Sequence, residues 1–285
     1  MGMKKLLIEL GLTDLERRRI DEAQPSLNSA GFDDFGMDPE TLKATLAVTR
    51  WIYTDYFRVK TRGIENVPQG RVLLISNHGG QIPIDGLLIG MAMLLEARPA
   101  RMVRGMIERW VPGVPFVSSL LARLGQTVGD VRNCRELLQK DQAVLVFPEG
   151  VRGSGKTIFK RYQLQRFGTG FIRLALETGT PIVPVAVVGC EEAYPSILNV
   201  KWLARWVGAP YIPVTPLFPF LGPIGALPLP TEVTVSFGPP LIPRGDPDGP
   251  ESEIELEANE VKSRIQAMLD ERVAERGSRW FGGKK

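Results

Sequence analysis

Residues 143–157 read AVLVFPEGVRGSGKT, an apolar, strand-like run that breaks into a loop at Pro148. Two comparable apolar runs are GRVLLISNH over residues 70–78 and PIVPVAVVG over residues 181–189. Such runs are typical of short strands that are buried on both faces. Segments with helical spacing lie between them, so strands alternate with helices from residue 71 to residue 189. This alternation predicts an α/β fold with a largely parallel, mixed sheet flanked by helices.

Capping residues and spacing predict the elements around this core. Asp38-Pro39-Glu40 is a capped helix start, and we expect that helix to run to about Phe57. Other helices are expected over residues 86–95, with Asp85 as N-cap, and over 101–110, 117–124, 134–140, 167–179 and 250–276, with strand-like segments at 57–68 and 231–241. We expect an irregular or loosely helical arm over residues 1–37, an α/β domain over 38–249, and a C-terminal helix with a basic tail over 250–285.

The composition is that of a globular protein with a sizeable core, since 44% of the 285 residues are hydrophobic and 24% are charged. Lys and Arg number 35 against 32 Asp and Glu, without a basic block, so we expect no nucleic-acid partner. Cys134 and Cys190 show neither metal-type spacing nor a disulfide framework. A reducing cytoplasm fits this pattern best, and we expect neither a metal nor a cofactor.

The N-terminal stretch MGMKKLLIELGL begins like a signal peptide, but Glu9 cuts its apolar run, so we expect no export. No stretch reaches the ~18 uninterrupted apolar residues that span a bilayer. Membrane contact is therefore expected to be peripheral, at the inner face. The Pro-rich, aromatic segment 202–230 is the candidate anchor, and an apolar flap packed on the core is the alternative. Its aromatic residues are Trp202, Trp206, Tyr211, Phe218 and Phe220.

His78 is the only histidine of the chain, and it follows a buried strand at the start of a glycine-rich loop. Asp85 lies seven residues further on, a separation of roughly 23 Å if the loop were extended. Gly79, Gly80 and Pro83 would let the loop fold back so that the two side chains meet. A paired carboxylate fixes the imidazole tautomer and stabilises the imidazolium, as in a general base. The alternatives are a plain loop histidine and a plain N-cap aspartate.

These segments resemble the glycerolipid acyltransferases of the lysophosphatidate (1-acylglycerol-3-phosphate) acyltransferase type. SNHGGQIPIDG is similar to that family's block of Asn-His with a spaced Asp, FPEGVR resembles its FPEGTR block, and GTPIVPVAVVG resembles its Val-Pro strand after a helix. The blocks stand in the family's order over about residues 66–241. The resemblance implies a glycerol-3-phosphate acyltransferase-like fold. It also implies transfer of a fatty acyl group from acyl-CoA or acyl carrier protein to a hydroxyl of a glycerolipid such as lysophosphatidate or an acylglycerol.

The first block departs from the common family spacing, which places Asp five residues after His. Residue 83 is Pro here, and Asp85 is the only carboxylate in reach. This longer NHxxxxxxD form resembles the subgroup that includes acylglycerol acyltransferases and bacterial relatives of uncertain substrate. The family's usual Gly-Arg block is only loosely matched by LARLGQTVGDVRN, in which we place Arg132 as a substrate-binding residue.

The resemblance also assigns roles around FPEGVR. Arg152 is expected to hold a phosphate or ester oxygen of the acceptor, because a guanidinium makes forked contacts with such oxygens. Gly150 lets the backbone approach the ligand. Glu149 is expected to accept a hydrogen bond from the acceptor hydroxyl or to hold Arg152 in place. The role of Lys156 is left open.

The same region also spells G-x-x-x-x-G-K-T over residues 150–157, the phosphate-binding loop of nucleoside triphosphatases. Three features count against a nucleotide. Glu149 would repel phosphates at the mouth of the loop, the following IFKRYQLQRFG has no clean apolar helical face, and no later strand ends in a clear metal-binding Asp.

The chain lacks a G-x-S-x-G elbow, and neither cysteine has the setting of a nucleophile, so we expect direct acyl transfer without an acyl-enzyme. The partners are then a lipid acceptor, an acyl thioester donor and a membrane surface. Two alternatives remain open, a P-loop nucleoside triphosphatase that uses residues 150–157 and a non-catalytic lipid-binding relative.

Overall fold

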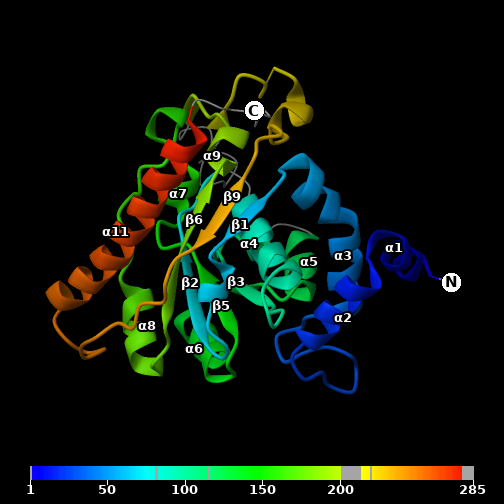
Figure 1. The fold of residues 1–285 in the computed structure, drawn as a ribbon, viewed down its shortest axis with the longest axis horizontal. Coiled ribbons are helices and arrows are strands. Elements are labelled where there is room, and N and C mark those ends of the chain that lie inside the picture. The colour runs from blue at the N-terminus through cyan, green and yellow to red at the C-terminus, as the bar shows by residue number, and fades with distance from the viewer. Residues whose placement is uncertain (1, 81–82, 114–115, 200–212, 219, 278–285) are drawn as a thin grey trace.

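The computed structural model describes residues 2–80, 83–113, 116–199, 213–218 and 220–277. Its centre is a seven-stranded sheet in the order β1-β9-β6-β2-β5-β3-β4, with helices on both faces (Figure 1). Neighbouring strands run parallel except for β6 and β9, which pair antiparallel. This confirms the predicted largely parallel, mixed sheet. The strands are β1 (Lys60–Arg62), β2 (Val72–Ser76), β3 (Val103–Ile107), β4 (Thr127–Val128), β5 (Ala143–Val146), β6 (Ile182–Val188) and β9 (Thr234–Phe237), and β7 (Leu198–Asn199) pairs separately with β8 (Pro213–Val214).

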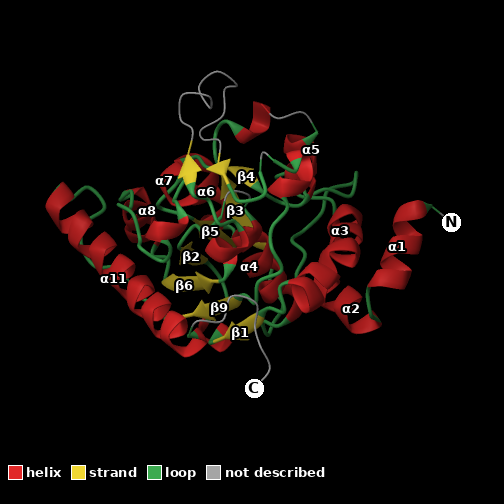
Figure 2. Cartoon of the chain, turned by 90° about the horizontal axis from the view of Figure 1, so that it is seen from above, coloured by secondary structure: helices red, strands yellow, loops and turns green. Residues whose placement is uncertain are grey.

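The helices form two groups, one on each side of the sheet (Figures 1 and 2). Helices α8 and α11 lie on one side, and α3, α4 and α5 lie on the other, with α1 and α2 outside α3. Their bounds are α1 (Met3–Gly11), α2 (Asp14–Glu22), α3 (Pro39–Trp51), α4 (Ile84–Leu95), α5 (Val117–Arg123), α6 (Val131–Gln139), α7 (Val151–Ser154), α8 (Gly170–Thr178), α9 (Cys190–Ala193) and α11 (Glu251–Arg276). Short helical turns cover residues 52–56, 64–66, 111–113, 158–160 and 222–226.

The sheet is buried on both faces because its strands are apolar at successive positions. Leu74 of β2 packs in the cluster that contains α3 and α4, whereas Leu73 and Ile75 pack in the cluster that contains α6, α8 and α11. Side chains of a strand alternate between the two faces, so an uninterrupted apolar run fills both layers. The parallel strands β2, β5 and β6 end at the same edge. That edge carries the loops at His78 and Pro148.

Three expectations from the sequence need correction. The expected helix over residues 101–110 is not formed: residues 103–107 are strand β3, because residues 103–105 pair with β5 and residues 106–107 with β4. The N-cap of α4 is Pro83, and Asp85 lies in the first turn of the helix. Residues 1–37 contain two well-defined helices, and α2 starts at a capping box of Thr13 and Glu16. The helix expected from Asp38 to about Phe57 is confirmed, since α3 ends at Trp51 and a π-helical turn continues it to Tyr56.

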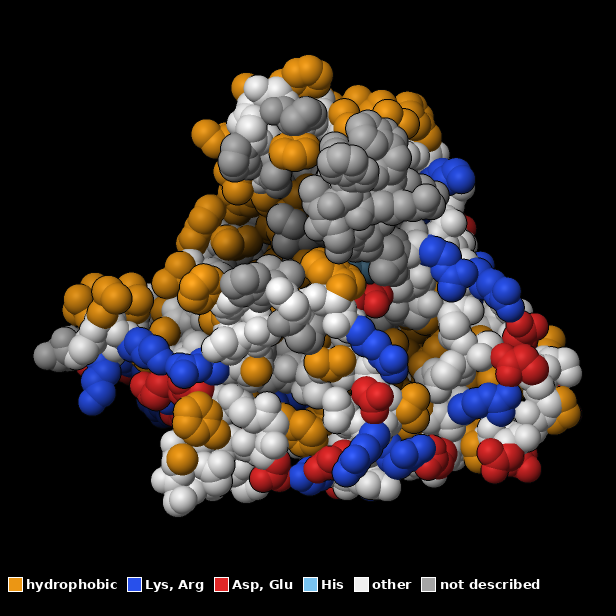
Figure 3. Space-filling view, turned by 180° about the vertical axis from the view of Figure 1, so that it is seen from behind, with side chains coloured by type: hydrophobic (Ala, Val, Ile, Leu, Met, Phe, Trp, Pro, Cys, Tyr) orange, Lys and Arg blue, Asp and Glu red, His pale blue; other side chains and the backbone are white. Residues whose placement is uncertain are grey.

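In the described part of the chain, every helix is too short or too polar to cross a bilayer. Exposed large apolar side chains gather in three places: on α1, around α5, and over residues 220–227. Figure 3 shows hydrophobic side chains along the upper left of the rear face, whereas charged side chains dominate its lower and right-hand parts. The residues are Met3, Leu6, Leu7 and Leu10 on α1, Phe116, Val117 and Leu120 around α5, and Phe220, Leu221, Ile224 and Leu227 in the third group. We call these three groups the apolar face.

Candidate active site

The end of strand β2 is anchored to β6 by Asn77, which is fully buried. The Asn77 side chain accepts a hydrogen bond from the Val187 backbone N–H at 2.8 Å and donates one to the Val187 carbonyl at 3.0 Å. The side-chain amide of Asn77 thus replaces the backbone hydrogen bonds that a further residue of β2 would make with Val187. It ends the strand at a defined position, and His78 follows directly at the edge of the sheet.

His78 and Asp85 lie in contact, as the sequence predicted. The Nδ1 atom of His78 is 2.7 Å from Oδ2 of Asp85, and Asp85 is fully buried. The Asp85 carboxylate also accepts hydrogen bonds from the backbone N–H groups of Gly79, at 2.9 Å, and Gly86, at 2.8 Å. Because Asp85 accepts three hydrogen bonds as a carboxylate, the hydrogen of His78 sits on Nδ1, and Nε2 is left as the basic nitrogen.

Electrostatics around His78 favour its protonated form. Burial by itself would lower the pKa of the imidazole, but the Asp85 carboxylate, with help from Glu149, outweighs it and raises the pKa above the ordinary value. Phe147 stacks on the imidazole at 4.4 Å between ring centroids. The ring is therefore held in one orientation, with its side chain 14% exposed.

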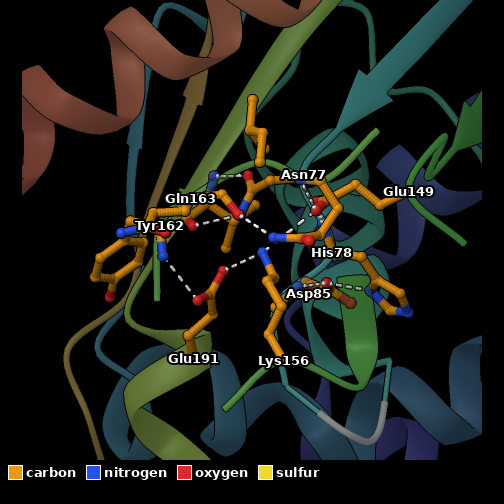
Figure 4. A network of polar contacts seen from close by, with 12 residues as sticks. Asn77, His78, Asp85, Glu149, Lys156, Tyr162, Gln163 and Glu191 are labelled. Atoms are coloured by element: carbon orange, nitrogen blue, oxygen red, sulfur yellow. Dashed lines mark hydrogen bonds and ion pairs between the residues drawn. The ribbon is translucent and has the colours of Figure 1, made fainter. Parts of the chain in front are cut away.

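Glu149 lies beside His78 but faces the protein interior rather than a substrate space. Its carboxylate is fully buried and accepts hydrogen bonds from the backbone N–H groups of His78, at 3.0 Å, and Gln165, at 2.8 Å. Lys156 Nζ lies 3.4 Å from the same carboxylate (Figure 4). Neither of the two roles expected for Glu149 is seen, because its oxygens contact neither Arg152 nor the cavity. Glu149 instead holds the backbone that carries the histidine.

A cavity of about 550 Å³ opens beside His78 and runs between α3, α4, β3 and α5. Its walls are mostly apolar, and among the described lining residues the ionisable side chains are His78 and Glu108. Apolar lining residues include Leu46, Leu87, Met91, Leu94, Met102, Val103, Leu121 and Phe147. A long, apolar space with a basic imidazole beside it suits a ligand with a hydrocarbon chain and one reactive polar group.

The structure brings some of the other expected residues to this cavity and leaves others away from it. Gly150 lines the cavity in the left-handed conformation at φ +55°, which glycine adopts without strain. Arg152 is exposed on α7, two residues beyond Gly150, and does not line the cavity. Arg132 is exposed on α6 and does not line it either. Of the aromatic residues in the 202–230 segment, Trp202, Trp206 and Tyr211 lie outside the described residues, whereas Phe218 is half-buried and Phe220 is 81% exposed.

The geometry of residues 150–157 does not suit a nucleotide. A phosphate-binding loop needs a helix that begins at its lysine, but α7 ends at residue 154, before Lys156, and the next helix of two turns or more is α8. The side chain of Lys156 is 4% exposed, and its ammonium group lies between two carboxylates. It is therefore not available to a phosphate, and this alternative is wrong.

Neither cysteine is set up as a nucleophile. Burial raises the pKa of the Cys134 thiol to about 12 and raises that of Cys190 well above its ordinary value. The described residues hold no group of three or more His, Cys, Asp or Glu side chains placed to bind a metal ion.

Glu191 is the clearest of the site residues that the sequence analysis did not single out. Its signal was a carboxylate just past the end of a buried strand, the same signal that singled out His78.

Comparison with known proteins points to one family. Residues 58–188 match the family model described as Acyltransferase. An uncharacterized protein of Mycobacterium leprae is 40% identical over 257 residues, which cover 88% of this chain and 70% of that protein. A Mus musculus protein, named a DGAT1/2-independent enzyme synthesizing storage lipids, is 24% identical over 211 residues, which cover 74% of this chain and 59% of that protein. The crystal structure of a 1-acyl-sn-glycerophosphate acyltransferase from Thermotoga maritima has the same fold, with a TM-score of 0.55 at 18% identity over 99% of this chain and 90% of that chain.

Proposed function

We propose an acceptor for this chain, which belongs to the acyltransferase family and is an acyltransferase. The proposed acceptor is a hydroxyl group of a glycerolipid such as lysophosphatidate or an acylglycerol. The fatty acyl group comes from acyl-CoA or acyl carrier protein, and His78 is the general base. One observation carries the proposal: the His78–Asp85 pair, with 2.7 Å between Nδ1 and Oδ2, lies at an apolar cavity of about 550 Å³. The name of the mouse relative, which refers to storage lipids, supports a lipid acceptor.

The reaction follows from the orientation of His78. Nε2 takes the proton from the acceptor hydroxyl while its oxygen attacks the carbonyl carbon of the thioester. A C–O bond forms and the C–S bond breaks, and the departing thiolate receives the proton from the imidazolium. Asp85 stabilises the imidazolium in between, which the raised pKa of His78 reflects. General base action typically supplies about 10²- to 10⁴-fold in rate.

The cavity is the proposed site of the acyl chain. Each methylene that leaves water for an apolar wall contributes about 0.8 kcal/mol. The lining residues on α3, α4 and β3 offer such walls along the length of the cavity. Chain binding therefore supplies affinity, and it places the thioester carbonyl at the end where His78 lies.

Arg152 is the proposed contact for the polar part of the acceptor. It is exposed on α7, next to the loop where Gly150 lines the cavity. A guanidinium in that place can contact a phosphate or ester oxygen of a lipid outside the cavity. A phosphorylated acceptor would gain more from this contact than an uncharged acylglycerol.

The apolar face is the proposed membrane contact, at the inner face of a membrane. Trp110 and Val117 line the cavity, and they are also 45% and 40% exposed, next to the exposed Phe116. A lipid chain that enters the cavity from a bilayer would therefore meet apolar side chains at α5. Exposed apolar groups of this kind are typical of proteins that bind the interface of a membrane.

Vesicle binding tests this membrane contact. Phe116→Asp should reduce co-sedimentation with phosphatidylglycerol vesicles, because a carboxylate would enter the bilayer interface. Leu256→Asp is the matched control, since Leu256 is 69% exposed on α11, on the opposite side of the molecule. Equal binding by the two variants would contradict the proposed face.

The catalytic role is tested by transfer of a labelled acyl group from acyl-CoA to lysophosphatidate and monoacylglycerol, followed by lipid mass spectrometry. His78→Ala should lower kcat by about 10²- to 10⁴-fold while the thermal unfolding midpoint stays close to that of the wild type. A His78→Ala protein that transfers acyl groups at the wild-type rate would refute the general base. Wild-type protein that acylates neither acceptor would refute the proposed substrate class.

A further inference from the structure

Lys156 belongs to residues 150–157, which match the sequence pattern of a phosphate-binding loop, yet its side chain lies in the protein interior. Its side chain is 4% exposed, and Nζ lies 2.8 Å from Oε1 of Glu191 and 3.4 Å from Oε2 of Glu149. Both carboxylates are buried as well. We call these three residues the Lys156 cluster (Figure 4). A buried ion pair contributes little stability compared with well-packed apolar residues, so its presence calls for another explanation.

Each carboxylate of the cluster holds the backbone of a loop. Glu149 accepts hydrogen bonds from the N–H groups of His78 and Gln165. Glu191 accepts a hydrogen bond from the N–H group of Tyr162 at 2.8 Å. The ammonium group of Lys156 therefore connects the end of β2, the loop after β5 and the start of α9. The pairing of β2 with β5 and β6 stops at Ile75 and Ser76, so it does not hold the residues beyond them.

Close packing makes the position of His78 depend on these contacts. A Cβ atom added at Gly79 would lie 2.8 Å from Cγ of Glu191, and one added at Gly153 would lie 2.9 Å from Cβ of His78. His78 and Gly79 are therefore enclosed between Glu191 on one side and the loop of Glu149 and Gly153 on the other. Little space is therefore left for either glutamate to shift against the backbone of His78 and Gly79.

The charges of the cluster are matched to each other. Burial alone would lower the pKa of Lys156, but Glu191 and Glu149 outweigh it and raise that pKa, so the ammonium group keeps its proton. Burial raises the pKa of Glu191, and Lys156 opposes this rise. Without the ammonium group, two buried carboxylates would face each other with no cation between them.

We propose that Lys156 is a positioning residue of the active site, which holds Glu149 and Glu191 together and so fixes the backbone of His78. The inference rests on the proposed role of His78 as general base. Lys156 touches no substrate in this arrangement. It acts through Glu149 on the place of the imidazole, and its charge also opposes the effect of the carboxylates on His78.

The experiment compares steady-state acyl transfer from acyl-CoA to lysophosphatidate by four proteins: wild type, Lys156→Met, the double variant Lys156→Met/Glu191→Gln, and Lys160→Met. Lys160 is the matched control, because it is an exposed lysine four residues further along the same loop. In the double variant, the oxygen of the introduced glutamine side chain can still accept from Tyr162, and its amide can donate toward Glu149. One of the two carboxylates that lose the ammonium group is thereby removed, and Glu149 remains.

Lys156→Met should lose at least about tenfold in kcat with little change in KM, since positioning affects the transition state rather than substrate binding. The acidic limb of its pH profile should move to higher pH, because a positive charge that lowers the pKa of His78 is gone. The double variant should recover part of kcat and move the limb back, and Lys160→Met should match the wild type. Thermal unfolding of each protein identifies loss of folded enzyme.

Three outcomes would overturn the inference. A Lys156→Met protein with wild-type kcat and pH profile would show that His78 does not need the cluster. A rise in KM at unchanged kcat would place Lys156 on the substrate. A double variant no better than Lys156→Met would show that charge balance is not the cause. If His78→Ala also keeps the wild-type rate, the proposed function fails instead, so the two failures can be told apart.

Discussion

Gly90 gives a direct test of where the acyl chain lies. Gly90 is on α4 and lines the cavity, and a Cβ atom added there meets no atom within 4 Å. It lies five residues beyond Asp85, or about 7.5 Å along the helix axis. An acyl chain that enters beside His78 and follows α4 must pass Gly90 before it reaches Leu94. A larger side chain at Gly90 should therefore shorten the space for the chain without touching the catalytic pair.

The expected size of the effect follows from the methylene groups displaced. A Gly90→Leu side chain would take the place of about two to four methylenes, each worth about 0.8 kcal/mol. The loss of about 1.6 to 3.2 kcal/mol corresponds to roughly 15- to 200-fold in kcat/KM for a long-chain donor relative to a short-chain donor. Gly90→Ala should give a smaller shift in the same direction. The helix itself gains from either change, because glycine is a poor helix former.

The assay measures kcat/KM for a ladder of saturated acyl-CoA donors of increasing length with one acceptor. Gly170→Leu is the matched control, because Gly170 is a helical glycine with no atom within 4 Å of an added Cβ and does not line the cavity. An unchanged chain-length profile in Gly90→Leu would refute the reasoning. Equal loss for all chain lengths would refute it too, since the chain would then not extend past α4.

Three further predictions concern the site. The proposed base must be neutral to act, and its pKa is raised, so activity should fall as pH drops through a value above the ordinary histidine pKa; in Asp85→Asn the acidic limb of the kcat/KM profile should move to lower pH and kcat should fall. An unmoved limb would mean that His78 is not the titrating group. Arg152→Ala should raise KM for lysophosphatidate more than for monoacylglycerol, and an equal change for both acceptors would remove Arg152 from phosphate binding. Asn77→Ala should lower unfolding stability by roughly 1–3 kcal/mol in denaturant titration, because buried backbone groups of β6 lose their partner; an unchanged midpoint would contradict that anchoring role.

Local sequence patterns were sufficient to predict most of the strands and helices. The apolar runs that became β2, β5 and β6 are strands, and the capped start at Asp38 begins α3. Pattern failed at residues 101–110, where β3 forms because β5 and β4 lie on either side of it. Pairing with distant strands outweighs local helical spacing. It also failed for Asp85, which lies inside the first turn of α4 and is turned toward His78.

The site shows the same division at the level of single residues. The contact between His78 and Asp85 could be predicted from the sequence, because the glycine-rich loop between them is able to fold back. The partners of Glu149 could not be foreseen, since they are backbone N–H groups of residues 71 positions earlier and 16 positions later. Lys156 and Glu191, 35 positions apart, meet only because the loops after β5 and β6 converge.

The sequence by itself determined the pairing of His78 with Asp85 and most of the order of strands and helices, because side-chain type and apolar periodicity are properties of short segments. Only the tertiary structure decided that Lys156 is a buried cation between two carboxylates rather than a phosphate ligand, and that α3, α4, β3 and α5 enclose an apolar cavity beside His78. The physical reason is that burial and charge pairing depend on neighbours from distant parts of the chain. These neighbours cannot be identified from a short segment of sequence, because they come together only when the chain folds.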